Sequence, residues 1–515
     1  MQQLEDILHL YFNHKTFRLG QKEIINDIIE GKSVLATLPT GAGKSLCYQL
    51  PALITQGTVI VVSPLLSLME DQVKQLKRQG HHIAVAINSF NTEQERQMIL
   101  SRLSQYKLIY LSPEMLQNQV ILDKLQKLQI DLFVIDEAHC ISQWGHEFRP
   151  DYLKLNQIIE HFNKPTTLAL TATATPDVQQ DIINQLPAVK FSKHIYPMDR
   201  SNIAFIVEHL ADPNQKDRYL IDLFEKFQLP SLIYFSSKKE AQRVAIMLHK
   251  QFLHLNVAYY HGDLDSTERQ LIQQQFMEDQ LDIVCCTSAF GMGVDKPNIR
   301  LIIHYHLPTQ IESFIQEIGR AGRDQLSSVS ITLATPYEHR LPERLIDSEL
   351  PKEAVVDRMF SYLSSLDLSI QPLPIKDEDW MIQLQVTETQ WRFLKNYLIN
   401  KQIIEHNQFV EHKNLFHVKK ELIKKIKQRN RYKMKKLDEL VRWLNTDHCR
   451  RDQLYQSFST PVSKLESLCC DQCGFSIDQW IPPSEANMAG NKLAKESWKD
   501  DLKELILPFK YRQLE

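Results

Sequence analysis

Two short segments hold residue types suited to phosphate chemistry, and the first is LPTGAGKS (38–45). Its glycines would let backbone N–H groups turn toward phosphate oxygens, while Lys44 could reach the β- and γ-phosphates and Ser45 could coordinate Mg²⁺. A glycine-rich turn without a ligand is the weaker interpretation, because an apolar run precedes the segment and a helix-compatible stretch follows it. The residues expected to bind nucleotide are Thr40, Gly41, Ala42, Gly43, Lys44 and Ser45.

The second segment is DEAH (136–139), which ends the apolar run LFVI. An acid at the carboxyl end of a parallel strand can reach a metal at a neighbouring phosphate loop, so Asp136 is expected to be the partner of Mg²⁺. Glu137 is the candidate to orient and deprotonate the attacking water. An acidic strand end is more often a solvated turn. The presence of the glycine-rich segment in the same chain nevertheless favours a catalytic role for these two acids. Together the two segments predict hydrolysis of a nucleoside triphosphate.

These residues need a parallel sheet to position them, and the pattern of apolar runs predicts two. Short β-rich runs bounded by turns and separated by helix-like stretches are typical of strands covered on both faces. The first series comprises 33–38, 58–63, 107–112, 131–136 and 166–171. The second series comprises 231–237, 257–261, 282–287, 301–306 and 329–334. We therefore expect two tandem α/β domains that join near residues 200–210.

The second predicted domain carries QEIGRAGRD (316–324), in which Gln316, Arg320 and Arg323 project from one helical face or its end. Guanidinium groups that reach a triphosphate on the other domain would stabilise transition-state charge and make closure depend on the nucleotide. An arginine-rich surface helix is the alternative.

Helix-period segments replace the strand pattern beyond residue 340. Two short β-like runs follow the segment 387–402, so 343–425 is interpreted as a small winged-helix-like module. Residues 419–436 then hold ten Lys and Arg residues and one acidic residue, Glu421. A solvated amphipathic helix and a DNA-contacting helix are both compatible with this run.

Four of the eight cysteines lie between residues 449 and 473. Four thiolates can close a tetrahedral Zn²⁺ site, which stabilises a small domain with little core. The expected metal ligands are Cys449, Cys469, Cys470 and Cys473. A three-cysteine remnant and a redox pair stay open as alternatives.

The amino-acid composition of the chain excludes disordered and fibrous proteins but few other classes of protein. The chain has 515 residues, with 60 Lys and Arg against 63 Asp and Glu, so bulk charge indicates no partner. The first ten residues lack the basic start of a signal peptide, and no apolar run is long enough for a bilayer. We therefore expect a cytoplasmic protein, nucleoid-associated if the source is bacterial, with no membrane partner.

The motifs, taken in order, resemble superfamily-two helicases and, within them, the RecQ family of DNA helicases. The matching segments are FRLGQKEII (17–25), LPTGAGKSLCYQLPAL (38–53), SPLLSLMEDQV (63–73), LSPEML (111–116), DEAHCISQWGHEFRPDY (136–152), LTATAT (170–175), AFGMGVDKPNIR (289–300) and QEIGRAGRD (316–324). The opening CRR and closing CDQC of the cysteine segment also resemble the zinc element of that family.

The resemblance implies roles for further residues. Arg18 and Gln21 match the adenine-reading element, which implies a preference for ATP. Thr171 and Thr173 match the segment that couples hydrolysis to strand separation. Arg323 matches the arginine finger, with Arg320 and Gln316 beside it.

The loop 140–152 is the most RecQ-like feature. Trp144, Phe148 and Tyr152 offer faces on which bases could stack, although a buried core position is the usual fate of such aromatic residues. His146 and Arg149 offer donors to phosphate, and Lys427 and Arg431 of the basic run are further candidates for DNA contact.

The resemblance implies an α/β fold with two RecA-like domains, followed by a mainly helical accessory region and a zinc element. The expected parts are 1–205, 206–342, 343–430 (the accessory module with its basic end), 431–476 (the zinc element) and 477–515 (a tail). Many RecQ proteins continue with a winged helix after the zinc element, whereas 42 residues follow Cys473 here. The chain therefore resembles a short form.

The expected activity is an ATP- and Mg²⁺-dependent DNA helicase that moves 3′ to 5′ on single-stranded DNA and unwinds duplex DNA in recombination or repair. We expect single-stranded and duplex DNA as partners and a monomeric state. An RNA helicase, and an ATP-switched nucleic-acid-binding or annealing protein without strand separation, are the alternatives.

Overall fold

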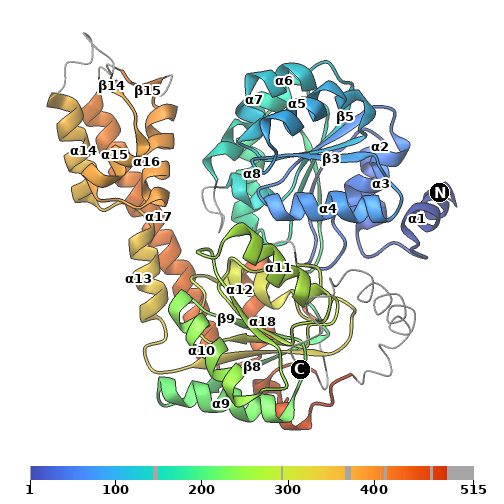
Figure 1. The fold of residues 1–515 in the computed structure, drawn as a ribbon, viewed down its shortest axis with the longest axis vertical. Coiled ribbons are helices and arrows are strands. Elements are labelled where there is room, and N and C mark those ends of the chain that lie inside the picture. The colour runs from blue at the N-terminus through green and yellow to red at the C-terminus, as the bar shows by residue number, and fades with distance from the viewer. Residues whose placement is uncertain are drawn as a thin grey trace, which may run out of the picture.

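The computed structural model describes residues 2–142, 149–291, 294–365, 373–405, 408–410, 414–463, 465 and 468–483 (Figure 1). Two sheet domains lie one above the other, and a smaller, mainly helical module lies at the end of a long helix (Figure 1). Among the described residues, none of the helices is long and apolar enough to cross a membrane.

The first domain contains a seven-stranded parallel sheet in the order β3-β4-β2-β5-β6-β1-β7. Its strands are β1 Ser33–Thr37, β2 Thr58–Val62, β3 Ala84–Ile87, β4 Leu108–Leu111, β5 Ile130–Ile135, β6 Thr166–Thr171 and β7 Phe191–Ile195. Its helices are α1 Gln2–Phe12, α2 Gln21–Ile29, α3 Leu46–Ile54, α4 Leu66–Arg78, α5 Glu93–Ser101, α6 Gln119–Leu125, α7 Leu155–His161 and α8 Pro176–Gln185. All five strands expected from the first series of apolar runs are present.

Successive side chains of each central strand pack alternately into two buried clusters, one on each face of this sheet. In β1, Val34 and Ala36 join the cluster that includes α1–α4, whereas Leu35 joins the cluster on the opposite face. This two-sided burial explains why the strands are apolar throughout rather than alternating.

The second domain contains a six-stranded parallel sheet in the order β10-β11-β9-β12-β13-β8. Its strands are β8 Ile203–His209, β9 Ser231–Tyr234, β10 Val257–Tyr260, β11 Ile283–Cys286, β12 Leu301–His304 and β13 Ser328–Ala334. Its helices are α9 Pro213–Lys226, α10 Lys238–Gln251, α11 Ser266–Met277 and α12 Ile311–Ile318. The expected boundary at residue 205 is wrong, because it falls inside β8, which pairs with β13 of the second sheet.

The accessory module combines three helices with a small antiparallel sheet. In chain order its elements are α14 Glu353–Ser365, β14 Leu373–Pro374, α15 Asp377–Leu384, α16 Glu388–Asn400, β15 Ile404–Glu405 and β16 Gln408–Phe409. The sheet order is β14-β16-β15, and β15 and β16 both fall within the first of the two expected β-like runs, 403–410. The second expected run, 415–420, is wrong as a strand, because it forms the first turns of the helix that begins at Leu415. The winged-helix-like assignment of the module stays a prediction. Its own core includes Trp380, Trp391 and Phe409.

A single helix, α17 Leu415–Leu444, runs from this module to the second domain (Figure 1). It packs along α14, then α13 (Arg340–Glu349), then α12. The expected boundary at residue 430 is therefore wrong, because it lies within a continuous helix. No Pro or Gly interrupts residues 415–444, and Lys, Arg and Leu favour helix.

The cysteine segment follows α17 and packs against the edge of the second sheet. It comprises α18 Arg450–Tyr455 and a short turn, Asp471–Cys473. The backbone N–H of Phe205 in β8 donates to the carbonyl of Cys469 at 3.1 Å. Of the expected tail, residues 477–483 are described, and Trp480 is buried against the second domain.

Candidate nucleotide site and metal centre

The glycine-rich segment forms the loop between β1 and α3, as expected. Gly41 and Gly43 adopt φ angles of 77° and 72°, in the left-handed region that favours glycine. The α3 helix begins at Leu46, directly after Lys44 and Ser45, so its N-terminus faces the loop. This geometry suits a phosphate group, because free N–H groups and the positive end of the helix dipole point the same way.

The acidic pair lies next to this loop. Lys44 Nζ and Glu137 Oε1 are 3.8 Å apart, which places the loop lysine and the expected catalytic carboxylate in one site. Asp136 is 6% exposed, and burial, followed by the neighbouring Glu137 carboxylate, raises the pKa of Asp136 to about 6. Glu137 itself has a left-handed backbone, with φ at 48°.

His139 connects this acidic pair to the expected coupling segment, a role that the sequence analysis missed. Its Nδ1 lies 3.3 Å from Glu137 Oε2 and 3.0 Å from Thr171 Oγ1. The N–H of Thr173 donates to Thr171 Oγ1 at 3.2 Å. The signal in the sequence for His139 is its place in the DEAH segment.

The two residues expected to read adenine support the phosphate loop in this structure. Gln21 Nε2 donates to the carbonyls of Ala42 and Gly43 at 2.8 and 2.9 Å, and its Oε1 accepts from the Arg18 N–H at 2.8 Å. Arg18 Nη1 also donates to the carbonyl of Gly41. Both side chains therefore bind the main chain of the loop between Gly41 and Gly43.

The arginine-bearing segment of the second domain reaches the same loop. Gln316 lies in α12, whereas Arg320 and Arg323 follow the end of that helix in a tight turn. A Cβ atom built on Gly41 would lie 3.2 Å from Arg323 Cγ. Arg323 Nη1 pairs with Asp295 Oδ1 at 2.7 Å, and Arg320 is 5% exposed. The candidate nucleotide site is thus formed by both domains.

Sequence reasoning also missed Arg200, which bridges these two sides. Its guanidinium group donates to the carbonyls of Thr40 in the loop and of Gly322 in the arginine-bearing turn, at 2.9 and 2.6 Å. The local sequence, YPMDRSN, carries no pattern that signals this contact.

The loop expected to contact DNA is described only in part. Trp144, His146 and Phe148 lie outside the described residues. Tyr152 is fully buried, and its hydroxyl donates to the carbonyl of Asp136 at 3.1 Å, so the expectation that it stacks on a base is wrong. Its phenol instead fills the core beneath the acidic pair.

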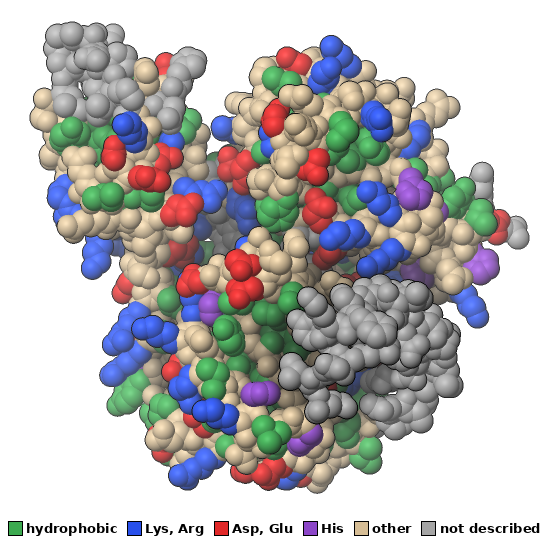
Figure 2. Space-filling model, viewed as in Figure 1, with side chains coloured by type: hydrophobic (Ala, Val, Ile, Leu, Met, Phe, Trp, Pro, Cys, Tyr) green, Lys and Arg blue, Asp and Glu red, His purple; other side chains and the backbone are tan. Residues whose placement is uncertain are grey.

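Arg149 lines a cleft between the first domain and the accessory module. The cleft has a volume of about 240 Å³, and its walls are formed by Glu114, Arg149 and Asp151 on one side and by Glu349, Leu350, Thr389, Arg392, Phe393, Asn396 and Arg429 on the other. Basic and acidic side chains both gather where the module faces the first domain (Figure 2). The outward face of α16 therefore faces the segment that carries the expected DNA-binding loop.

The basic run lies on α17, and part of its charge is used within the protein. Four lysines pair with acids in order along the helix: Lys419 with Asp357, Lys427 with Glu353, Lys433 with Glu349 and Lys436 with Glu312. Lys427, a candidate for DNA contact, is thus in an ion pair of 2.6 Å, whereas Arg431 is exposed. The charge run divides into an inward face that binds neighbouring helices and an outward face open to solvent.

The four expected cysteine ligands converge. Their sulfur atoms all lie within 4.8 Å of one another, and Cys449 Sγ and Cys469 Sγ are 3.6 Å apart. A tetrahedral Zn²⁺ site with Zn–S bonds of about 2.3 Å requires sulfur separations of about 3.8 Å. The adjacent Cys469 and Cys470 both reach the cluster, because Cys470 is extended and the chain turns at Asp471–Cys473. The donor set and its spacing fit zinc.

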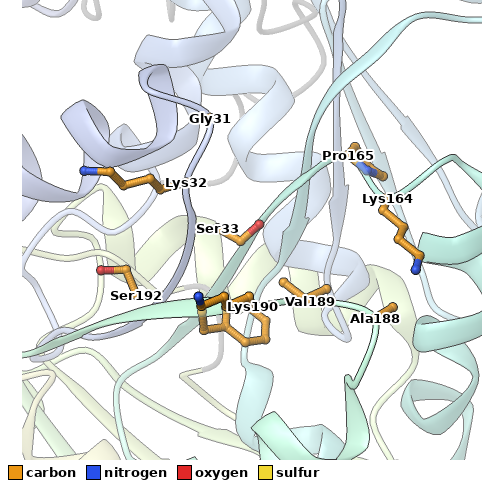
Figure 3. Close-up of a pocket in the computed structure, with 10 residues that line it drawn as sticks. Gly31, Lys32, Ser33, Lys164, Pro165, Ala188, Val189, Lys190 and Ser192 are labelled. Carbon is orange, nitrogen blue, oxygen red and sulfur yellow. The ribbon is translucent and has the colours of Figure 1, made fainter.

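A larger cavity, of about 400 Å³, lies at the opposite end of the first sheet (Figure 3). It is lined by residues at the start of β1 and before β6, among them Lys32, Ser33 and Lys164. Lys32 and Lys164 extend to opposite sides of it (Figure 3), so their charges do not converge on one ligand position. The candidate nucleotide site lies at the other end of the sheet.

Comparison with known proteins agrees with this geometry. The DEAD/DEAH box helicase family matches residues 18–182, and the helicase conserved C-terminal domain matches residues 215–325. Solved structures with the same fold include the Mycobacterium smegmatis helicase Lhr bound to ssDNA and AMP-PNP, with a TM-score of 0.55, 16% identity, and coverage of 79% of this chain and 60% of that chain. The DUF1998 helicase MrfA bound to DNA has a TM-score of 0.57 and 18% identity, over 80% of this chain and 62% of that chain.

Curated relatives give a closer match. The chain is 41% identical to the probable ATP-dependent DNA helicase RecS of Bacillus subtilis over 98% of this chain and 97% of that protein. It is 40% identical to the ATP-dependent DNA helicase RecQ of the same organism over 68% of this chain, and it spans 60% of that relative's length. The match to RecQ of Haemophilus influenzae is 38% identical over 66% of this chain and 54% of that relative. This chain therefore belongs to the RecQ family of superfamily-two helicases.

Proposed function

We propose that this protein is an ATP- and Mg²⁺-dependent DNA helicase that moves 3′ to 5′ along single-stranded DNA and unwinds duplex DNA in recombination or repair. The observation that carries the proposal is the meeting, at Gly41, of the phosphate loop of one domain and the arginine-bearing turn of the other. Nucleotide bound there would hold the two domains together, and its hydrolysis would release them.

Each residue of the site has a role in this proposal. Lys44 binds the β- and γ-phosphates, and Glu137 takes a proton from the attacking water. Arg320 and Arg323, with Gln316 beside them, stabilise the charge that develops on the transferred phosphate. Arg18 and Gln21 contact the adenine ring and keep the loop in shape.

The Mg²⁺ ion would be held by the Ser45 hydroxyl and the Asp136 carboxylate. Both are oxygen donors of the kind that Mg²⁺ prefers, and the ion would neutralise negative charge on the phosphate groups. His139, Thr171 and Thr173 would transmit the state of Glu137 to the surface that contacts DNA.

Several surfaces are proposed to contact DNA. The loop with Trp144, His146 and Phe148 would stack on bases and bind phosphate, and Arg149 would continue this track into the cleft beneath α16. Arg431 on the outward face of α17 would contact the sugar–phosphate backbone, and Lys427 would add to it at the cost of its ion pair with Glu353. We infer that Cys449, Cys469, Cys470 and Cys473 hold Zn²⁺, and that the protein acts as a monomer in the cytoplasm.

The decisive experiment is strand separation of a short duplex that carries a single-stranded tail at either the 3′ or the 5′ end. We expect ATP-dependent unwinding of the 3′-tailed substrate alone. Lys44→Ala and Glu137→Gln should each lower ATP turnover by about 100-fold or more, while DNA affinity stays close to that of the wild type.

Three outcomes would contradict parts of the proposal. Unwinding of the 5′-tailed duplex would reverse the polarity. DNA-stimulated hydrolysis without unwinding of either substrate would mean an ATP-switched binder, and stronger stimulation by RNA than by DNA would mean an RNA helicase. Normal hydrolysis by Lys44→Ala would show that the site is elsewhere.

A further inference from the structure

Arg200 lies between β7 and β8, in the segment that joins the two sheet domains, and it is 7% exposed. Its four side-chain hydrogen bonds all go to main-chain carbonyls. The acceptors are Thr40, Gly319, Ala321 and Gly322, at 2.9, 3.3, 3.2 and 2.6 Å. Nη1 of the guanidinium group therefore contacts both the phosphate loop and the arginine-bearing turn, whereas Nη2 contacts the turn alone.

These contacts set the distance between the two halves of the nucleotide site. Thr40 belongs to the loop that precedes Lys44, whereas Gly319 and Gly322 flank Arg320 in the second domain. A Cβ atom on Gly319 would meet Thr40 Oγ1 at 1.9 Å, so the two segments are as close as glycine allows. A small displacement of Arg200 would therefore move the arginine finger relative to the phosphates.

The charge of Arg200 favours a nucleotide-bound arrangement. Burial, followed by the positive charge of Arg323, lowers the pKa of Arg200 to about 10, so the group stays charged at neutral pH. Among the described residues, no carboxylate accepts a hydrogen bond from it. A buried cation that has only carbonyl partners is costly, and an anionic triphosphate in the adjacent loop would offset that cost.

A second buried arginine, Arg451 of the cysteine segment, binds the main chain of Arg200. Arg451 Nη1 donates to the carbonyl of Arg200 at 3.0 Å and also pairs with the carboxylate of Asp199. Its Nη2 donates to the carbonyl of Ile203, and the guanidinium group lies 4.9 Å from the centre of the Phe205 ring. Both Arg451 and Asp199 are at most 2% exposed at their side chains.

The placement of Arg451 depends in turn on the cysteine cluster. Arg451 is two residues after Cys449, and the N–H of Arg450 between them donates to Cys470 Sγ at 3.4 Å. The same cluster is fastened to β8 through the carbonyl of Cys469. A continuous set of contacts thus links the four sulfur atoms to the phosphate loop.

We propose that Arg200 is a positioning residue that ties the phosphate loop to the arginine-bearing turn, and that Arg451 of the cysteine segment acts on ATP hydrolysis through Arg200. This inference rests on the proposed hydrolysis of ATP at this site. It assigns to the cysteine segment an effect on the nucleotide site that neither a DNA-contacting role nor a purely structural role would include.

The test compares the full-length Arg200→Gln and Arg200→Lys variants with the wild type in DNA-stimulated ATP hydrolysis. We expect Arg200→Gln to lower kcat at least about tenfold with a smaller change in KM, because positioning matters most in the transition state. Arg200→Lys keeps the positive charge but not the planar guanidinium group with its several donors, so its kcat should lie between those of Arg200→Gln and the wild type. Arg218→Gln, at an exposed position of α9, serves as the matched control and should leave both constants unchanged.

A double-mutant cycle tests the link to the cysteine segment. We expect Arg451→Gln, or Asp199→Asn where the first variant folds poorly, to lower kcat, and the double variant with Arg200→Gln to lose little more than Arg200→Gln alone. Additive losses would overturn the claim that Arg451 acts through Arg200, and a normal kcat in Arg200→Gln would overturn the whole inference. Absence of DNA-stimulated hydrolysis in the wild type would instead overturn the proposed function.

Discussion

Glu137 is held in a backbone conformation that few residues with side chains adopt. Its φ and ψ angles are both 48°, and such a left-handed residue costs about 1–2 kcal/mol when it is not glycine. The conformation brings its carboxylate within 3.8 Å of Lys44 and 3.3 Å of His139. The strain is retained where one side chain must face both the phosphate loop and the coupling segment.

The contact between His139 and Thr171 leads to a prediction about coupling. In His139→Ala, the acidic pair and the phosphate loop remain, but the side chain between Glu137 and Thr171 is lost. We expect the ATP consumed per base pair separated to rise about tenfold, the equivalent of one lost hydrogen bond of about 1.4 kcal/mol. Parallel measurement of ATPase and unwinding rates checks it, with the exposed His161→Ala as control; an equal fall in both rates would argue against coupling through His139.

At the scale of elements, the strands of the two large sheets that the sequence analysis missed share a position. β3, β7 and β8 all lie at the edges of their sheets, and β7 has no fully buried residue. Central strands are apolar on both faces and are recognisable from composition, whereas edge strands contact neighbours on one side only. For this reason the central strands were predictable, and of the four edge strands only β10 was expected, at 257–261.

In the candidate site, residues that belong to a local sequence pattern were predictable, whereas residues that act through contacts distant in sequence were not. The phosphate loop, the acidic pair and the cysteine ligands are local patterns, and the structure brings each set together. Arg200 acts only through segments near residues 40 and 320, which are distant in sequence. Likewise, the basic run could not reveal which of its lysines face the acids of α13 and α14, because that depends on helix packing.

The ion pairs along α17 predict a difference in stability between neighbouring lysines. Lys436 pairs with Glu312 at 2.8 Å, and both side chains are less than 10% exposed, whereas Lys435 is exposed. In Lys436→Met, Glu312 would be left buried without its cation, so we expect a loss of about 3–5 kcal/mol. Urea unfolding should show Lys435→Met close to the wild type, and equal midpoints for the two variants would contradict this account of α17.

The cysteine segment predicts dependence on a metal. We expect about one Zn²⁺ per chain by elemental analysis, and a strong chelator should lower the melting temperature and release the metal. Cys473→Ser should bind less zinc, and added zinc should restore the chelated wild type but not this variant. A metal-free protein that is insensitive to the chelator would favour the redox pair or the three-cysteine alternative.

At the scale of the whole molecule, the accessory module and the first domain face each other across the cleft that Arg149 lines. The outward face of α16 presents Thr389, Arg392 and Asn396 to this cleft, while Trp391 and Leu394 pack in the core of the module. The second helix of a helix-turn-helix unit commonly contacts DNA through this outward face. The module therefore adds a surface that the two sheet domains do not have.

Arg392 provides the test of that surface. We expect Arg392→Ala to weaken binding to tailed duplex DNA about fivefold or more at moderate salt and to lower the salt dependence of binding, because one phosphate contact is lost. ATP hydrolysis without DNA should not change. Arg344→Ala, exposed on α13, is the matched control in fluorescence-anisotropy titrations, and identical affinities for the two variants would exclude α16 from the DNA track.

The 30-residue helix α17 begins in the accessory module at Leu415 and ends at Leu444 beside α12 of the second domain. At 1.5 Å per residue it measures about 45 Å, and a tilt of about 10° at its root displaces its far end by about 8 Å. That distance is about twice the rise between stacked nucleotides of about 3.4 Å. A tilt of this size at one end of the helix is therefore large, at its other end, on the scale at which a nucleic-acid strand advances.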